Sequence, residues 1–220
     1  MKRKTPAKTI KIQGTGLHKG GDIELGLYPA DTGICFIKDG VKILAAPENI
    51  VDTRLNTTIG AGEVRISTIE HLMCALFGLG ITDCDIVVGG DEMPAMDGSA
   101  LPFVTCIQSA GVKVLDSEIS PIVITDPVRV ESGGSWVEIV PGTFSVSYEI
   151  DFADQAIGKQ NYTYAGKDFA REIAPARTFG LLKDVETMRS LGLALGGGLH
   201  NAVVVDGENV LNPEGLRFVD

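Results

Sequence analysis

The sequence predicts an α+β fold with two domains of similar build, 1–115 and 116–220. Two observations support this prediction. In the first half, segments in which apolar residues alternate are followed by segments with helical periodicity. The same order, strands first and helices later, begins again after the polar segment 116–121. The chain is therefore expected to form two α+β layers that meet near residues 112–120.

The strands of the first half come before its helices. Apolar residues alternate in four segments that Gly and Asp residues separate, which are 8–14, 22–29, 34–38 and 41–46. Apolar residues then recur at helical spacing from Ile69 to Leu76, and Gly78 marks the end of this helix. Residues 84–90 have the pattern of a buried strand, and residues 97–111 that of a second helix.

The second half repeats this order. Its pattern predicts strands at 121–131, 135–142, 144–152 and 201–207, helices at 167–174 and 182–192, and a short strand or turn at 209–215. In the first half a full helix follows the strand 84–90, whereas nothing follows Asp220. A sheet without its closing helix would leave an apolar face in water. We therefore expect the second domain to be incomplete at its C-terminal end.

Composition excludes several classes of protein. The formal net charge is −10, which opposes general binding to nucleic acids because phosphate backbones are repelled. The N-terminal segment lacks the apolar region of a secretory signal, and no apolar run approaches the length of a membrane span. Four cysteines without CxxC pairing are typical of reduced core thiols, so we expect a cytoplasmic protein; they are Cys35, Cys74, Cys84 and Cys106.

An adjacent acid and histidine, Glu70 and His71, stand at the start of the first predicted helix. One interpretation is structural: Ser67 caps the helix, Glu70 completes a capping box, and His71 lies on the surface. The other is a metal site, in which His71 is one of the three protein ligands that catalytic zinc requires and Glu70 acts as a base. The H-E-x-x-H motif of many metalloproteases is absent.

Further metal ligands are not obvious from the pattern. Cys74 lies three residues after His71 and could face the same side, although a Cys in an apolar helix is usually a core residue. His18 lies in a Gly-rich turn that could approach a ligand or simply form a hairpin. His200 follows a Gly-rich loop and has the position of a surface residue. The residues alone leave both interpretations of Glu70 and His71 open.

Several long motifs taken in order resemble one family. They are "GTGLHKG", "PADTGICF", "STIEHLMCALFGLGI", "MPAMDGSALPFV", "ARTFGLLKDVE", "GLALGGGLHNAVV" and "VLNPEGLRF". Their order is similar to that in the UDP-3-O-acyl-N-acetylglucosamine deacetylases, whose members remove an N-acetyl group in lipid A synthesis. The resemblance implies two α+β domains with helices packed between two sheets. It also implies a protein that needs Zn²⁺ and acts on a small UDP-sugar carrying an acyl chain. We expect this protein to be a monomer.

The resemblance also implies roles for individual residues. His71 is expected to be a zinc ligand, Glu70 the general base, and Thr178 a donor that stabilises the tetrahedral oxyanion. Phe179 is expected to line the sugar pocket, and five residues an apolar passage for the acyl chain, namely Leu181, Val185, Ala194, Gly198 and Leu199. The remaining substrate-binding candidates are Leu55, Asn56 and, near the nucleotide sugar, His18.

One departure from the family pattern lies at the end of the chain. The family's other two zinc ligands belong to a His-Lys-x-x-Asp motif after the "GLRF" segment, and its general-acid histidine comes later; neither is present here, nor is a phosphate-binding lysine. We therefore expect a truncated, partial or split version that binds zinc poorly and turns over little substrate. The rival expectation is a non-catalytic remnant that binds the nucleotide sugar or the acyl chain.

Overall fold

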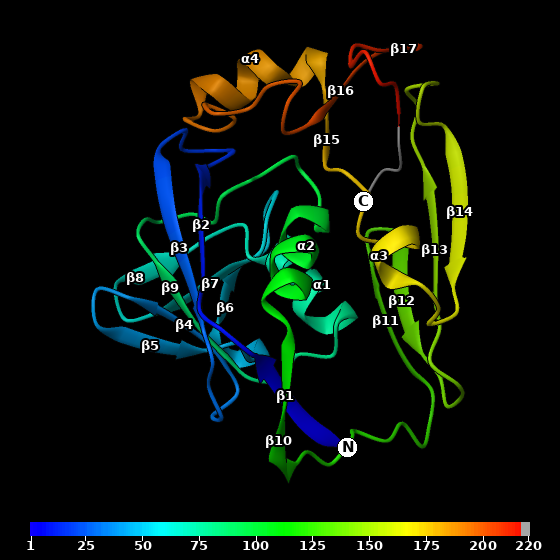
Figure 1. The fold of residues 1–220 in the computed structure, drawn as a ribbon. Coiled ribbons are helices and arrows are strands. Elements are labelled where there is room, and N and C mark those ends of the chain that lie inside the picture. The colour runs from blue at the N-terminus through cyan, green and yellow to red at the C-terminus, as the bar shows by residue number, and fades with distance from the viewer. Residues whose placement is uncertain (217–220) are drawn as a thin grey trace.

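The computed structural model describes residues 1–216 and has an α+β fold, as predicted (Figure 1). The helices are α1 (Glu70–Gly78), α2 (Leu101–Ala110), α3 (Phe169–Glu172) and α4 (Leu182–Ser190), with one 3-10 turn, η1 (Pro47–Asn49). The strands are β1 (Lys2–Pro6), β2 (Ile10–Thr15), β3 (Asp22–Tyr28), β4 (Ile34–Lys38), β5 (Val41–Leu44), β6 (Ile50–Asp52), β7 (Thr58–Ala61), β8 (Val64–Ile66), β9 (Cys84–Val88), β10 (Val112–Glu118), β11 (Val128–Ser132), β12 (Ser135–Ile139), β13 (Val146–Asp151), β14 (Lys159–Tyr164), β15 (Phe179–Leu181), β16 (Val203–Asp206) and β17 (Asn209–Val210).

A five-stranded mixed sheet forms the first half, in the order β2-β3-β9-β4-β5. Among the described strands of this sheet, only β4 and β9 pair in parallel. Alternate residues of these strands face a common core, where Leu27, Phe36 and Ile86 are fully buried. Leu72 and Leu76 of α1 are fully buried in the same core, and α2 contributes to it as well. The helical spacing that predicted α1 therefore reflects packing against this sheet.

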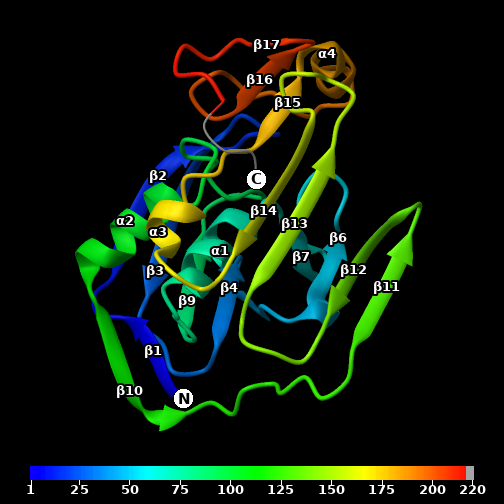
Figure 2. The same ribbon diagram turned by 90° about the vertical axis from the view of Figure 1, so that its right-hand side faces the viewer.

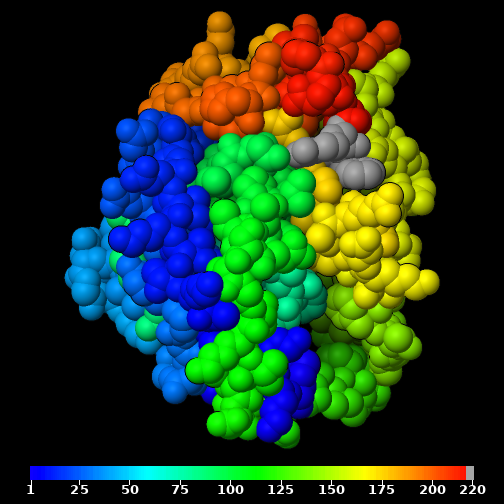
Figure 3. Space-filling model, viewed as in Figure 1, coloured from blue at the N-terminus to red at the C-terminus, as the bar shows by residue number. Residues whose placement is uncertain are grey.

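The second half has smaller sheets. β11 pairs with β12, β13 pairs with β14, and β15, β16 and β17 form a three-stranded sheet. Figures 1 and 2 show α1, α2 and α3 between the first-half sheet and the β13–β14 pair, the arrangement that the resemblance implied. In the space-filling view, α2 fills the middle of the face between the blue first-half strands and the yellow α3 region (Figure 3).

The predicted domain boundary between residues 115 and 116 falls within β10. This strand pairs with β1 from Val112↔Pro6 to Glu118↔Lys2, so the joining segment is part of an ordered sheet. The end of the second predicted domain, residues 217–220, lies outside the described residues. Within the described part, no helix combines the length and the apolar character needed to cross a membrane.

Two predicted elements are shorter than expected. The strand predicted at 121–131 begins only at Val128, because Pro121 and Pro127 cannot donate to a ladder. The helix predicted at 167–174 is reduced to the single turn of α3, since Pro175 disfavours helical backbone in the residue before it. The sequence analysis did not predict β1, the small sheet β6-β7-β8, β10, β14 or β15.

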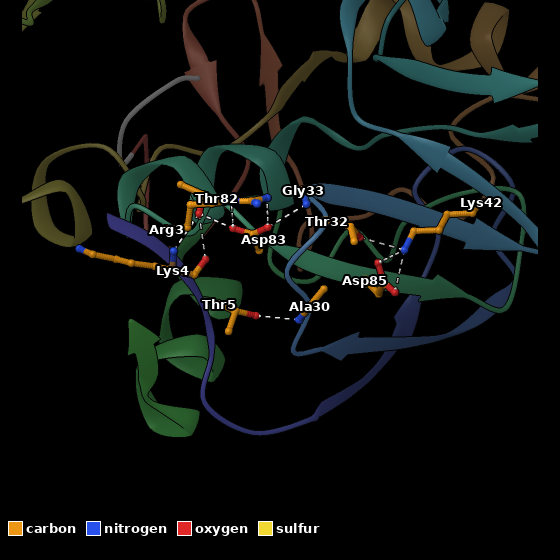
Figure 4. Close-up of polar contacts among 10 residues, drawn as sticks. All are labelled: Arg3, Lys4, Thr5, Ala30, Thr32, Gly33, Lys42, Thr82, Asp83 and Asp85. Atoms are coloured by element: carbon orange, nitrogen blue, oxygen red, sulfur yellow. Dashed lines mark hydrogen bonds and ion pairs between the residues drawn. The ribbon is translucent and has the colours of Figure 1, made fainter. Parts of the chain in front are cut away.

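A buried carboxylate connects the N-terminus to the sheet (Figure 4). Asp83 is fully buried and accepts hydrogen bonds from the Arg3 guanidinium through both oxygens. It also accepts the backbone N–H of Gly33 at 2.8 Å and the hydroxyl of Thr82 at 2.6 Å. A buried carboxylate is stable only when it is paired and hydrogen-bonded. The network therefore fixes the segment before β9 against β1.

Gly78, the last residue of α1, lies directly against the ring of Phe169 in α3. A Cβ atom at position 78 would overlap this ring. Helix propensity alone predicts that Gly78→Ala stabilises the protein by about 1 kcal/mol. We expect the opposite, a destabilisation of about 1–3 kcal/mol, because the ring must move.

Thermal or urea unfolding measures the effect of Gly78→Ala. The control is Gly142→Ala in an exposed loop, where an added Cβ meets no atom within 4 Å. Equal or greater stability of Gly78→Ala would show that the contact between α1 and α3 is loose.

Candidate active site

Glu70 and His71 form the first turn of α1 and line a cavity of about 540 Å³ between the two halves of the chain. The capping-box interpretation is wrong. The N-cap is Ile69, and no side chain of the described residues caps this end of the helix. The Ser67 hydroxyl instead donates to the carbonyl oxygen of Asp91 at 3.1 Å.

The Glu70 carboxylate is held from outside its own helix. The backbone N–H of Thr57, just before β7, donates to Glu70 Oε2 at 2.9 Å. The small sheet β6-β7-β8 therefore has a direct part in the site, although it was not predicted. A carboxylate held in this way faces the cavity in one orientation, as a general base requires.

The His71 imidazole is half-buried beside Glu70. Burial lowers its pKa from the ordinary value, and this effect outweighs the charges of Glu70 and Asp97, which favour the protonated form. The ring is therefore neutral at neutral pH. Only a neutral imidazole can offer a nitrogen lone pair to a metal or accept a proton.

Asp97 is a site residue that the sequence analysis missed. Its charge acts on His71, although the two residues are far apart in sequence. Its carboxylate accepts hydrogen bonds from the backbone N–H and the hydroxyl of Ser99, at 3.0 and 2.6 Å. The sequence "MDGS" around Asp97 could have identified it as a candidate, because functional residues often lie in loops such as the turn before a helix.

Aromatic side chains form much of the cavity wall opposite α1. Tyr148 of β13 and Tyr162 and Tyr164 of β14 line it, as do Phe144 and Phe169. The Tyr162 hydroxyl donates to Glu172 Oε2 at 2.8 Å, so this hydrogen-bonded pair is a polar group on an otherwise apolar wall. Apolar walls with a few polar groups are typical of small-molecule sites. Sequence reasoning missed these residues because their convergence depends on how β13 and β14 pack over α1.

Thr178 lies beside the segment that carries Asp97. Its backbone N–H donates to the Gly98 carbonyl oxygen at 2.8 Å, and its methyl group is close to Gly98. Its carbonyl oxygen accepts the N–H of Val203 at 2.9 Å. Within the described residues, Thr178 is not part of the cavity lining around Glu70. The Asp97–Gly98 segment is what connects it to His71.

Phe179 and Leu181 lie in β15 and pack into a second apolar cluster with Val203 and Val205. The Phe179 ring meets Phe152 edge to face, with 5.2 Å between the ring centroids. β15 and β16 are parallel and α4 connects them, so this part of the chain is a βαβ unit. The sequence analysis had placed Phe179 in a sugar pocket and Leu181 in an acyl passage, and the structure brings both to this unit.

The other predicted passage residues belong to the same unit or to the loop after it. Val185 lies half-buried in α4, Ala194 and Gly198 lie in the loop, and Leu199 is 41% exposed. The structure thus groups these residues near β15 and β16, apart from the Glu70 cavity.

His18 is buried in the turn between β2 and β3 and touches the loop after α4. Its carbonyl oxygen accepts the N–H of Leu195 at 3.0 Å, and Ala194 N–H donates to its Nδ1 at 3.4 Å. Its Nε2 is buried and has no hydrogen-bond partner among residues 1–216.

Leu55 and Asn56 lie just before Thr57, the residue that holds Glu70. The Leu55 side chain is 66% exposed, and Asn56 Oδ1 accepts the Thr58 hydroxyl at 2.8 Å. His200, which the sequence analysis did not assign to the site, is exposed.

The side chains that line the cavity include donors of the kind that bind metals. A neutral His71 beside Asp97, at the edge of a cavity, fits one side of a zinc site. Residues 1–216 contain no cluster of three or more His, Cys, Asp or Glu side chains that could hold a metal ion by themselves. Among the described residues, the side chains that would fit such a site are therefore the His71 imidazole and the neighbouring Glu70 carboxylate.

The fold and the cavity define the class of the protein, an α+β protein with an adjacent carboxylate and imidazole at the edge of a cavity of the small-molecule type. The sequence profile of LpxC, UDP-3-O-acyl N-acetylglycosamine deacetylase, matches residues 3–220. The chain belongs to this deacetylase family.

Individual relatives agree with the profile. The chain is 44% identical to a UDP-3-O-acyl-N-acetylglucosamine deacetylase of Anaeromyxobacter dehalogenans, covering 99% of this chain and 73% of that protein. It is 45% identical to the Campylobacter jejuni protein of the same name, covering 100% of this chain and 77% of that protein. It is 46% identical to the Acidithiobacillus ferrooxidans protein, again of that name, with 100% and 76% covered.

Proposed function

We propose that this protein hydrolyses the N-acetyl group of UDP-3-O-acyl-N-acetylglucosamine to the free amine and acetate, the committed step of lipid A biosynthesis. The observation that carries the proposal is the Glu70–His71 pair at the edge of an aromatic-walled cavity, in a chain of the deacetylase family. The cytoplasm is the proposed compartment, which suits the four free cysteines. Burial raises the pKa of the Cys84 thiol to about 12, so this thiol is unreactive.

Glu70 is the proposed general base. It takes a proton from the water that attacks the acetamide carbonyl carbon, and the Thr57 N–H keeps its carboxylate oriented. Thr178 is the proposed donor to the oxyanion that then develops, a contribution of about 3 kcal/mol for one donor. An acid must protonate the leaving amine, and the family pattern places that histidine after the "GLRF" segment.

Zn²⁺ is the proposed cofactor, with His71 as one of its ligands. When bound, it supplies Lewis-acid polarisation of the reacting groups and lowers the pKa of coordinated water. The neutral state of the His71 ring supports this assignment. In the family pattern the other two ligands belong to the His-Lys-x-x-Asp motif, which follows the "GLRF" segment.

Substrate binding is proposed for the residues around the βαβ unit and the turn at His18. Burying each CH₂ group of an acyl chain contributes about 0.8 kcal/mol, so an apolar passage can anchor the substrate while polar groups orient the sugar. Phe179, Leu181, Val185, Ala194, Gly198 and Leu199 are the proposed contacts, together with His18, Leu55 and Asn56.

The function is tested by incubating the protein with UDP-3-O-acyl-N-acetylglucosamine and measuring the free amine by mass spectrometry. A folded protein with zinc supplied that releases no acetate would refute catalysis by this chain. The aromatic walls of the cavity also suit a second candidate, a protein that binds the nucleotide sugar or the acyl chain without catalysis. Binding of the substrate with no hydrolysis would support that candidate.

The role of His71 is tested by metal content. We expect His71→Gln to lower the zinc affinity of the protein by at least tenfold, because one ligand is lost. Equilibrium dialysis followed by elemental analysis measures this, with His200→Gln as the matched control on an exposed loop. Equal zinc affinity in the two variants would remove His71 from the metal site.

A further inference from the structure

We propose that Glu92 is a positioning residue, which holds the backbone before α1 so that Glu70 and His71 face the cavity. The inference deepens the proposed function and rests on it for its catalytic consequence. Glu92 is 1% exposed and lies in the segment between β9 and α2. It does not line the cavity among the described residues, so it acts through other groups.

Three donors converge on the Glu92 carboxylate. The Thr68 hydroxyl donates to Oε1 at 3.2 Å, and the His18 N–H donates to the same oxygen at 2.8 Å. The Lys19 N–H donates to Oε2 at 2.9 Å. Gly16 lies so close to Oε2 that a Cβ there would overlap it. The turn between β2 and β3 therefore packs closely against this carboxylate and hydrogen-bonds to it.

Thr68 has an unusual backbone conformation. Its φ is +61°, in the left-handed region, and its side chain is buried. A β-branched residue is a genuine outlier there, because its Cβ substituents crowd the backbone. Such strain costs about 1–3 kcal/mol and persists only where the surroundings enforce it. The bond to Glu92 is the polar contact that holds the Thr68 side chain in this conformation.

The strained residue sets the direction of α1. The next residue, Ile69, supplies the carbonyl oxygen that accepts the N–H of Met73 at 3.0 Å. Glu70 and His71 lie between these two positions. The backbone on either side of Glu92 is bonded to Ser67, through Ser67 N–H to Asp91 O and Met93 N–H to Ser67 O, both at 2.9 Å. Main-chain bonds thus fix Ser67, and the Glu92 side chain fixes Thr68.

The test uses Glu92→Ala, Thr68→Val, Thr68→Gly and the double variant Thr68→Gly/Glu92→Ala. Thr68→Val removes the hydroxyl but keeps the shape of the side chain. Thr68→Gly removes the strain, because glycine adopts positive φ freely. The matched control is Thr5→Val, since Thr5 is also buried, lies in β1, and its oxygen accepts the Ala30 N–H at 2.9 Å (Figure 4). The readouts are kcat and KM, unfolding temperature, and amide hydrogen exchange at Met73.

We expect Glu92→Ala to lower kcat on the order of 10²-fold and Thr68→Val about tenfold, with faster exchange at Met73 in both. In the Thr68→Gly background, Glu92→Ala should lower kcat only about threefold or less, because glycine needs no anchor there. A structural role limited to the turn at His18 would give the same loss in both backgrounds, and that result would overturn the inference. Unchanged kcat and exchange in Thr68→Val would also overturn it, even where Glu92→Ala fails to fold.

The two proposals fail in different ways. If the wild-type protein releases no acetate, the proposed function fails. Hydrogen exchange at Met73 still tests the positioning role, because it requires neither substrate nor metal.

Discussion

Glu70→Ala is expected to lower kcat for deacetylation by about 10²–10⁴-fold, the usual contribution of a general base. The fold should be retained, because the side chain is only half-buried. Zinc content should also be retained, because His71 is the proposed ligand. Turnover with saturating substrate, together with elemental analysis, separates the loss of the base from the loss of the metal.

A matched acidic residue controls for the change in net charge. Glu63 lies in the exposed turn between β7 and β8, so Glu63→Ala should leave kcat unchanged. Glu70→Gln keeps the shape and an acceptor for Thr57 but cannot take a proton at neutral pH, and it should be as slow as Glu70→Ala. Wild-type turnover in Glu70→Gln would remove Glu70 from the mechanism as the base.

Asp83→Ala is expected to have the largest effect on stability. Removing one partner of a buried ion pair typically costs 3–5 kcal/mol, and we expect about 3 kcal/mol because the Arg3 side chain keeps 23% exposure. The N–H of Gly33 loses its acceptor at the same time. For a chain of this length, that lowers the unfolding temperature by roughly 6–12 °C, as calorimetry would measure.

The control for this prediction is a surface carboxylate. Glu118 is 66% exposed on its side chain and lies 3.5 Å from Lys2 Nζ, so Glu118→Ala should cost less than about 1 kcal/mol. If Asp83→Ala unfolds at the same temperature as Glu118→Ala, the buried network contributes no more than a surface pair.

Much of the first half could be predicted from sequence because its elements have strong periodicity. Alternation located β2, β3, β4 and β5 within a few residues, and helical spacing located α1. The three strands between residues 50 and 66 are only three or four residues long. Such strands are too short to show a clear alternation of apolar and polar residues. β1 carries charged residues and a proline, which are typical of an edge strand rather than of a core strand.

The site could be predicted only in part. The adjacent Glu70 and His71 are visible in the sequence, but the capping box was a false signal because Ser67 bonds to Asp91 instead. The residues that support the pair come from distant segments: Thr57 before β7, and Asp97 and Glu92 after β9. A sequence pattern describes a residue only relative to its neighbours along the chain. The roles of Thr57, Asp97 and Glu92 depend on contacts between distant segments, which form only when the chain folds.

The pairing of β1 with β10 has a consequence for biosynthesis. Lys2 lies opposite Glu118, and the Met1 amino group donates to the Ile119 carbonyl oxygen at 3.1 Å. On the ribosome, more than 100 residues must be added after β1 before its partner strand β10 exists. Contacts between residues so far apart in sequence form slowly, since the loop must close first. In a nascent chain β1 therefore stays unpaired until β10 has been made, and a chaperone could bind it during that period.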